Sequence, residues 1–263
     1  MNWFQVKAYI KHRFRKKQWR AGDFSSLVAA ELAKYVIYNH HPYYSFQDVD
    51  DIRHDLQQAK QKLEVTDFGV GSKKFKTNER SIRHLIKYNA TPKKQGEFIF
   101  RLVQYLKPCN IIELGTSLGI GTLYLALPNS LTQVFTIEGC PKISQIAQQN
   151  FSIAGALNIV QHIGSFQDEL PMILASVDQV GMVYFDGHHA YQPTIDYFHL
   201  CLNKAKGKTV FVFDDIYWSK GMAMAWNEII AHPSVSLSFD FFSFGVVVLN
   251  VPYVKEHYFI TNI

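Results

Sequence analysis

The sequence contains few cysteines, and they lie far apart. Cys109, Cys140 and Cys201 are the three cysteines in 263 residues, and none belongs to a C-x-x-C pair. An odd number at such wide spacing predicts reduced thiols and argues against a zinc site. We therefore expect a cytoplasmic protein.

Long apolar runs are also missing. Runs such as Val246–Leu249 have the length of a β-strand, whereas a membrane-spanning helix needs about 20 apolar residues. The N-terminus has no apolar run followed by a small-residue cleavage site, so we expect no secretory signal peptide. With 48% hydrophobic and 19% charged residues, the composition is typical of a globular protein that buries a core.

Acidic residues are absent from the first 20 positions. These positions hold seven of the 27 lysines and arginines, which leaves 20 basic and 22 acidic residues in the rest of the chain, so the net charge of +5 is local. Aromatic and basic residues alternate over residues 3–20, which predicts a basic amphipathic helix. Contact of residues 1–20 with an anionic surface stays open. Packing on the chain's own domain is the simpler expectation, because no nucleic-acid module matches.

The stretch Ile111–Thr122 reads as a buried strand, a turn rich in glycine and the start of a helix. Gly115, Gly119 and Gly121 have the spacing G-x-x-x-G-x-G, which differs from the G-x-G-x-x-G of dinucleotide folds. Glycine lets a backbone approach a ligand, and a helix start offers free N–H groups and a positive dipole end. We expect a polar or anionic cofactor to bind here, at the carboxyl edge of a parallel sheet.

Strands and helices alternate from residue 109 onward, as in a doubly wound parallel sheet. Strands are expected at 109–113, 133–138, 159–163, 181–186, 209–214, 235–242 and 245–250. Helices are expected near 118–127, 141–154, 166–177, 190–205 and 219–231. The short join between the last two strands indicates an antiparallel hairpin. The expected fold is α/β, with a doubly wound, Rossmann-like seven-stranded sheet that ends in a C-terminal hairpin.

The N-terminal third is expected to be entirely helical. Helices are predicted at 3–20, 24–38, 45–63, 79–88 and 92–106. We divide the chain into a helical N-terminal segment, 1–95, and a second domain, 96–263. Asp67–Lys73 contains closely spaced glycines, but no buried strand precedes it and it does not match the phosphate-loop pattern. A surface loop is expected there.

Acids end four of the five predicted parallel strands: Glu113, Glu138, Asp186 and Asp214, the last followed by Asp215. A single acid can simply cap a helix, but four at one edge predict a ligand site. A carboxylate at the position of Glu138 accepts the two ribose hydroxyls of a nucleoside cofactor. An NAD site would carry the same acid, so only the glycine spacing distinguishes an NAD site from the site of another nucleoside cofactor. Ser165 and Phe166 follow the third strand and are candidates to meet an adenine, although Phe166 is equally a core candidate.

Four segments together resemble a bacterial family of class I S-adenosylmethionine (SAM) dependent methyltransferases: Ile112–Gly119, Thr136–Pro141, Asp186–His189 and Phe213–Trp218. The family also carries a helical N-terminal segment with a D-F-G-x-G-S motif, seen here at Asp67–Ser72. It is related to the metal-dependent catechol and caffeoyl-CoA O-methyltransferases. The resemblance implies that residues 96–263 form a SAM-dependent methyltransferase domain.

The resemblance also implies a set of site residues. The SAM contacts would be Glu113, Gly115, Thr116, Ser117, Gly119, Glu138, Gly139, Ser165, Phe166 and Asp186. A divalent ion, Mg²⁺, would lie on Asp186, Asp214 and Asp215. The related enzymes have a lysine three residues after the strand-four Asp, where this chain has His189. We expect His189 and Asp186 to be the catalytic residues.

These residues favour methyl transfer from SAM to an oxygen of a small-molecule acceptor, with divalent-metal assistance. One alternative is a nucleic-acid methyltransferase that uses the basic N-terminus, although no N-P-P-Y-type motif follows the fourth strand. A nicotinamide oxidoreductase is disfavoured by the glycine spacing and the hairpin. A non-catalytic SAM-binding protein is the third alternative. The sequence assigns neither an acceptor nor an oligomeric state.

Overall fold

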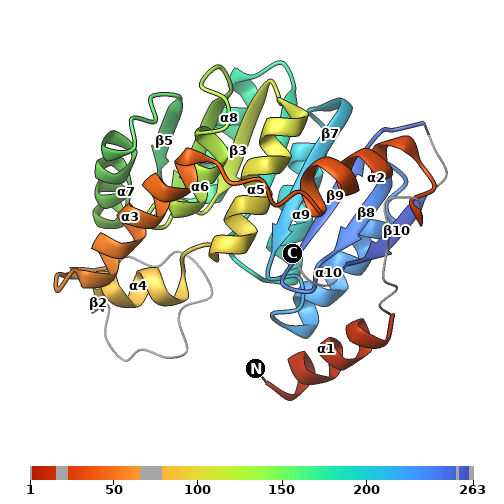
Figure 1. Cartoon of the computed structure of the whole chain (residues 1–263), viewed down its shortest axis with the longest axis horizontal. Coiled ribbons are helices and arrows are strands. Elements are labelled where there is room, and N and C mark those ends of the chain that lie inside the picture. The colour runs from red at the N-terminus through yellow and green to blue at the C-terminus, as the bar shows by residue number, and fades with distance from the viewer. Residues whose placement is uncertain (1, 16–22, 66–78, 253–254, 261–263) are drawn as a thin grey trace.

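The computed structural model describes residues 2–15, 23–65, 79–252 and 255–260. Within these residues, helices cover both faces of an eight-stranded sheet with the order β10-β8-β9-β7-β6-β3-β4-β5 (Figure 1). Its strands are β3 (Asn110–Leu114), β4 (Gln133–Glu138), β5 (Ile159–Ile163), β6 (Val180–Phe185), β7 (Ala205–Asp214), β8 (Val235–Asp240), β9 (Phe244–Leu249) and β10 (Glu256–Phe259). The predicted α/β, doubly wound fold is confirmed.

The five strands from β5 to β7 are parallel. β9 runs antiparallel to both of its neighbours, β7 and β8. The predicted C-terminal hairpin is therefore present as β8 and β9. Because the parallel strands point the same way, their carboxyl ends, with the predicted acids, lie at one edge of the sheet.

The prediction of seven strands is wrong by one within the described part of the chain. β10 follows the last predicted element and pairs parallel with β8, with Tyr258 opposite Phe239. A four-residue strand gives too short a pattern to be recognised in a sequence. Its pairing satisfies backbone groups at the open edge of β8 and buries Tyr258, which is 3% exposed.

Two groups of helices cover the sheet. The helices are α1 (Trp3–Arg15), α2 (Leu27–Leu32) with a π-helical turn (Ala33–Ile37), α3 (Tyr44–Gln58), α4 (Ile82–Tyr88), α5 (Lys93–Leu106), α6 (Ile120–Ala126), α7 (Pro141–Ile153), α8 (Phe166–Ser176), α9 (Tyr191–Leu202) and α10 (Lys220–Ala231). Buried residues of α2 to α7 form one core with the sheet, and those of α8 to α10 form a second core. Adjacent residues of β6 alternate between them, with Met182 and Tyr184 in the first and Val183 and Phe185 in the second.

The N-terminal third is not entirely helical, contrary to prediction. Lys62–Glu64 (β1) and Glu79–Ser81 (β2) form a two-stranded antiparallel sheet. Three-residue strands formed by long-range pairing leave no periodic signal in a sequence. The Asp67–Lys73 loop lies outside the described residues. None of the described helices has the length and hydrophobicity of a membrane span.

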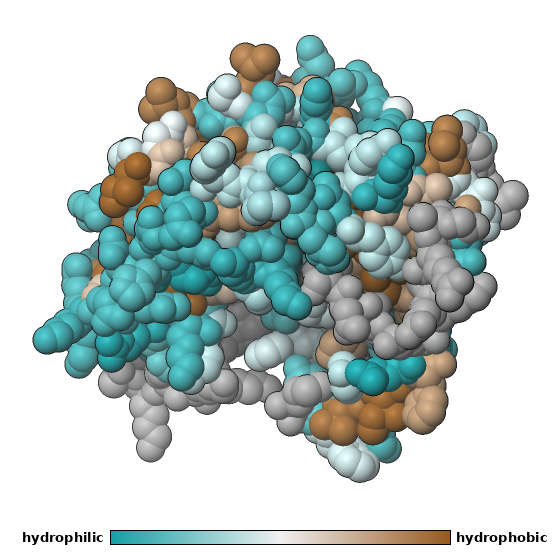
Figure 2. All heavy atoms as spheres, viewed as in Figure 1, coloured by the Kyte–Doolittle hydropathy of each residue, from teal (hydrophilic) through white to brown (hydrophobic). Residues whose placement is uncertain are grey.

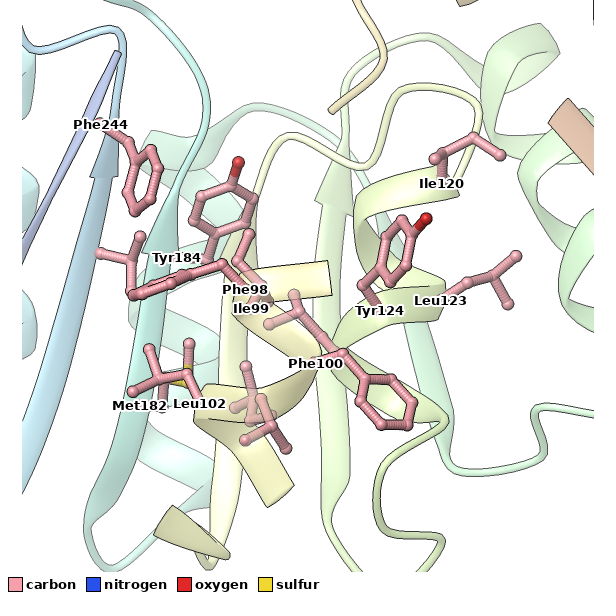
Figure 3. Packing of buried hydrophobic residues seen from close by; sticks show 14 of the residues in the cluster. Phe98, Ile99, Phe100, Leu102, Ile120, Leu123, Tyr124, Met182, Tyr184 and Phe244 are labelled. Carbon is pink, nitrogen blue, oxygen red and sulfur yellow. The ribbon is translucent and has the colours of Figure 1, made fainter. Parts of the chain in front are cut away.

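Helix α5 packs directly on the centre of the sheet. Figure 3 shows Phe98, Ile99 and Leu102 of α5 beside Tyr184 of β6. Gly96, near the start of α5, allows the helix to approach Tyr124 of α6, because a Cβ at Gly96 would lie 2.2 Å from two carbons of the Tyr124 ring. Residues on both sides of the proposed boundary at 95 thus share one core, and the boundary itself stays a prediction.

Glu113 is a buried carboxyl at the end of β3, with 1% of its surface exposed. The hydroxyls of Thr122 and Thr136 donate hydrogen bonds to its Oε2, at 2.5 and 2.6 Å. These bonds join β3 to α6 and to β4. Burial raises the pKa of Glu113 to about 7, although the two hydroxyl donors act in the opposite direction.

We predict that Gly96→Ala destabilises the protein, because the new methyl group would overlap the fully buried ring of Tyr124. The expected loss is about 1–3 kcal/mol, measured by urea unfolding. Gly221→Ala in α10 is the matched control. The nearest atom to its new Cβ is 3.4 Å away, so this helical glycine should tolerate alanine or gain up to about 1 kcal/mol. Equal stability of the two variants would contradict the close packing of α5 on α6.

We also predict that Glu113 makes stability depend on pH. Its pKa is raised in the folded state from 4.5 to about 7, so its contribution is fully present below about pH 4.5 and is lost as the pH rises through about 7. Glu113→Gln does not titrate and should therefore gain up to about 3 kcal/mol relative to wild type between pH 4.5 and 8. Urea unfolding at both pH values measures this, with Glu79→Gln, an exposed carboxyl, as control. A difference that stays constant with pH would refute the prediction.

Candidate active site

The turn after β3 is held against the ends of two neighbouring strands. The backbone N–H groups of Gly115 and Thr116 donate to the carbonyl of Ile137 at the end of β4, at 3.1 and 3.2 Å. Gly115 has a φ of 112°, and a Cβ there would lie 2.2 Å from the carbonyl oxygen of Asp186 at the end of β6. Only glycine fits this backbone and this approach. The turn is therefore a close-packed feature at the centre of the carboxyl edge.

Gly119 caps α6 from a left-handed conformation, with a φ of 82°. A Cβ there would lie 2.5 Å from a ring carbon of Phe151 in α7. The first N–H groups of α6 follow directly after Gly119. Their attraction for an anion is limited, because a seven-residue helix has only a small dipole. Thr116 turns its hydroxyl inward, 2.6 Å from that of Thr136, so it presents backbone rather than side chain to the edge.

Glu138 closes the turn from the side of β4. Its Oε2 accepts from the N–H of Ser117 and its Oε1 from the N–H of Cys140, both at 2.9 Å. Gly139 lies between these two contacts. A carboxylate offers about four acceptor sites, which is the chemistry that the predicted ribose contact requires. Glu138 is half-buried at the edge, unlike Glu113, which lies inside the core.

Ser165 and Phe166 begin α8 beside this turn. Ser165 caps the helix: its hydroxyl accepts from the N–H of Asp168 and donates to the carboxylate of Asp168. The ring of Phe166 lies 5.3 Å from that of His188 and 5.9 Å from that of Tyr197. Phe166 is half-buried and packs against the second core. Its position is therefore compatible with a role in the core and also with contact between its exposed edge and a ligand.

Two carboxyl groups meet where β6 and β7 end. Asp186 and Asp214 hydrogen-bond to one another, and burial and then the charge of Asp214 raise the pKa of Asp186 well above its usual range. Burial and then the charge of Asp215 raise the pKa of Asp214. Burial raises the pKa of Asp215 itself to about 6. These acids form a compact, strongly interacting group next to the glycine turn.

The two histidines after β6 have different surroundings. Nε2 of His189 lies 3.8 Å from Oδ1 of Asp186, and burial lowers the pKa of His189, which favours the neutral imidazole. His188 packs with Phe166, and its Nδ1 lies 3.3 Å from the hydroxyl of Tyr197. Both residues have positive φ, 62° for His188 and 29° for His189. The strained turn brings His189 close to Asp186, and its expected role as a catalytic residue stays a prediction.

The arrangement of the acids does not fit the predicted Mg²⁺ site. Asp186, Asp214 and Asp215 offer the oxygen ligands that Mg²⁺ prefers. Within the described residues, however, no group of three or more His, Cys, Asp or Glu side chains is placed to hold an ion. The two closest carboxyls share a hydrogen bond instead. No chemical step below is therefore assigned to a metal.

Sequence reasoning missed Gln95, which lies in the first turn of α5 and is 4% exposed. Its side-chain amide donates to Oδ1 of Asp214 at 2.8 Å and lies 3.1 Å from the hydroxyl of Tyr184. The available signal was a polar residue directly before Gly96 and three residues after Pro92, at the start of a helix. The N-terminal part of the chain thus supplies a direct partner to the carboxyl pair.

Comparisons with known proteins agree with this architecture. A sequence profile of a family described as "Methyltransferase domain" matches residues 112–216. A catechol O-methyltransferase from Niastella koreensis is 32% identical over 126 residues, which are 46% of this chain and 56% of that protein. The chain thus spans about half the length of the curated relative it matches.

Solved structures share the fold at low sequence identity. An O-methyltransferase from Bacillus cereus in complex with S-adenosylhomocysteine (SAH) has a TM-score of 0.58 at 18% identity, over 86% of this chain and 98% of the other. TomG from Streptomyces achromogenes, in complex with SAM, has a TM-score of 0.57 at 15% identity, over 89% and 100%. Together, these findings show that residues 112–216 are similar to a methyltransferase domain and that the chain shares the fold of O-methyltransferases solved with SAM or SAH.

Proposed function

We propose that this chain transfers the methyl group of SAM to an oxygen of a small-molecule acceptor. The observation that supports this most is the meeting, at one sheet edge, of the glycine turn, Glu138 and the group formed by Asp186, Asp214 and His189. The curated relative is named for O-methylation of a catechol. The SAM-bound and SAH-bound neighbours support SAM as the methyl donor.

The cofactor side of the proposal rests on the turn and on Glu138. A Cβ at Gly115 would overlap the backbone of Asp186, and one at Gly119 would overlap the ring of Phe151. Both glycines therefore allow the close packing of the turn, and close approach of backbone to a ligand also needs glycine. Glu138 would accept the ribose hydroxyls through its carboxylate oxygens. The proposed contacts are Glu113, Gly115, Thr116, Ser117, Gly119, Glu138, Gly139, Ser165, Phe166 and Asp186. Glu113 would act indirectly, because its carboxyl is buried behind the turn.

On the acceptor side, His189 would remove the proton of the attacking hydroxyl. SAM, when bound, supplies an electrophilic methyl group on a sulfonium centre. Methyl transfer needs the acceptor oxygen in line with that group and in its deprotonated form. The lowered pKa of His189 keeps its imidazole neutral and able to accept a proton. Asp186, 3.8 Å away, would orient the ring and stabilise its protonated form once ionised. Gln95 would position Asp214.

We predict that Glu138→Ala weakens SAM binding at least tenfold. Two charge-assisted hydrogen bonds to the ribose would be lost, each worth roughly 1.5–3 kcal/mol. Isothermal titration calorimetry with SAM and with NAD measures the effect. Asp178→Ala is the control, because Asp178 is exposed and precedes β6, at the opposite edge of the sheet. Tight binding of NAD without binding of SAM would overturn the proposed cofactor.

We predict that His189→Ala slows methyl transfer by about a hundredfold or more, the scale of general-base catalysis. The assay is transfer from radiolabelled SAM to a panel of simple phenols and catechols. His199→Ala, which removes an exposed histidine of α9, should have wild-type activity. SAM affinity of His189→Ala should also be unchanged. Near wild-type turnover in His189→Ala would assign the base to another group.

The same assay tests divalent-metal assistance, which the sequence predicts and which the arrangement of the three acids does not favour. If an ion takes part, EDTA abolishes turnover and added Mg²⁺ restores it. The Asp214→Asn variant then loses turnover even when no EDTA is present. Turnover that EDTA leaves unchanged would exclude metal assistance and leave proton transfer to His189 as the acceptor-side chemistry.

A further inference from the structure

Helix α1 is attached to the C-terminal part of the sheet through a buried contact between His12 and Asp240. Nε2 of His12 lies 3.0 Å from Oδ1 of Asp240, and these side chains are 1% and 0% exposed. Asp240 also accepts from the hydroxyl of Tyr217 and the indole N–H of Trp226, at 2.8 and 3.0 Å. Tyr9 adds an edge-to-face contact with Phe242. The inner face of α1 is therefore fixed on the protein, and its outer face has one orientation.

That outer face is apolar. Trp3, Ile10 and Phe14 are 72%, 49% and 86% exposed, and their spacing of seven and four residues places them on one side of a helix. Figure 2 shows apolar side chains gathered over α1 at the bottom of the view. Scattered exposed apolar residues are ordinary, but a row of three large ones on a single helix is typical of an interaction surface.

Positive charge surrounds this face. Helix α1 contains Lys7, Lys11, Arg13 and Arg15 and no acid. The ammonium group of Lys7 lies over the Trp3 ring, 5.1 Å from its centroid, so charge and apolar surface are directly adjacent. We propose that the outer face of α1 docks the protein on an anionic phospholipid bilayer. Trp3, Ile10 and Phe14 enter the headgroup and acyl boundary, and the lysines contact anionic headgroups.

The apolar row and the positive charges of α1 together fit a bilayer better than they fit other binding partners. Nucleic acid would match the charge, but it offers no apolar region to accept three exposed hydrophobic side chains. A second copy of the chain would match the apolar row, but it would bring two helices with four cations each together. A bilayer offers an apolar interior and a negative surface at once, and tryptophan is enriched at that boundary.

Docking in this way would place the candidate active site near the bilayer. The side-chain amide of Gln5 donates to the carbonyl of Trp218, at 3.2 Å. Trp218 belongs to the loop that leaves the carboxyl end of β7, where Asp214 and Asp215 lie. Trp218 is itself 52% exposed and adds an aromatic side chain next to α1. The proposal does not depend on the methyl acceptor or on SAM binding.

The test is co-sedimentation of the full chain with vesicles of phosphatidylcholine alone and of equal parts phosphatidylcholine and phosphatidylglycerol. We expect binding to the mixed vesicles, loss of binding as salt is raised, and little binding to phosphatidylcholine. Trp3→Ser with Phe14→Ser should weaken binding at least about tenfold. Lys7→Gln with Lys11→Gln should weaken it about tenfold and reduce its salt dependence.

Leu131→Ser with Leu157→Ser is the matched control, because these side chains are 91% and 94% exposed outside α1. This control should bind vesicles like wild type, and all variants should keep the wild-type melting temperature, since the exchanged side chains are exposed. Absence of binding to the mixed vesicles, or equal binding by the Trp3 and Phe14 variant, overturns the proposal. So does a change of sedimentation coefficient in that variant without vesicles, which would assign the face to a second copy. Binding of duplex RNA, but not vesicles, through the lysines would assign it to nucleic acid.

Discussion

The candidate site depends on how closely the turn after β3 packs against the neighbouring strand ends. Two N–H groups of the turn bond to Ile137, and Glu138 accepts the N–H of Ser117 from the other side. Asp186 donates its own N–H to Leu114, at 2.9 Å. These bonds join three strand ends into one rigid unit. A side chain at position 115 would separate them, because its Cβ would overlap the backbone of Asp186. The positions of the proposed contacts in the turn, of Glu138 and of Asp186 follow from this packing.

Buried carboxyl groups serve different purposes in different parts of the sheet. Glu113 bonds two threonines inside the core and ties the turn to its helix. Asp186 and Asp214 face each other at the edge, where burial and then the charge of Asp214 raise the pKa of Asp186. Asp240 accepts donors from three separate elements and attaches α1. Satisfied buried carboxyls are structural, whereas a pair of acids with raised pKa values next to an edge is typical of a functional site.

The N-terminal part of the chain is integral to the site. Gln95 reaches Asp214 from α5, and α1 lies against the loop that follows β7. Buried residues of α2, α3 and α4 share one core with the sheet. The N-terminal part of the chain therefore contacts the carboxyl edge in two places, through Gln95 at the start of α5 and through Gln5 of α1.

The sequence by itself determined the α/β alternation, the glycine turn, the acids at the strand ends and the terminal hairpin. Each is a local pattern: apolar runs separated by helices, glycine spacing, or an acid directly after a strand. It missed β10, β1 and β2, and it missed Gln95, because these depend on pairing or packing between residues far apart in the chain. It also placed both Glu113 and Glu138 among the expected SAM contacts. Only the tertiary structure decided that one is buried in the core and the other lies at the edge, since burial is set by what packs around a side chain.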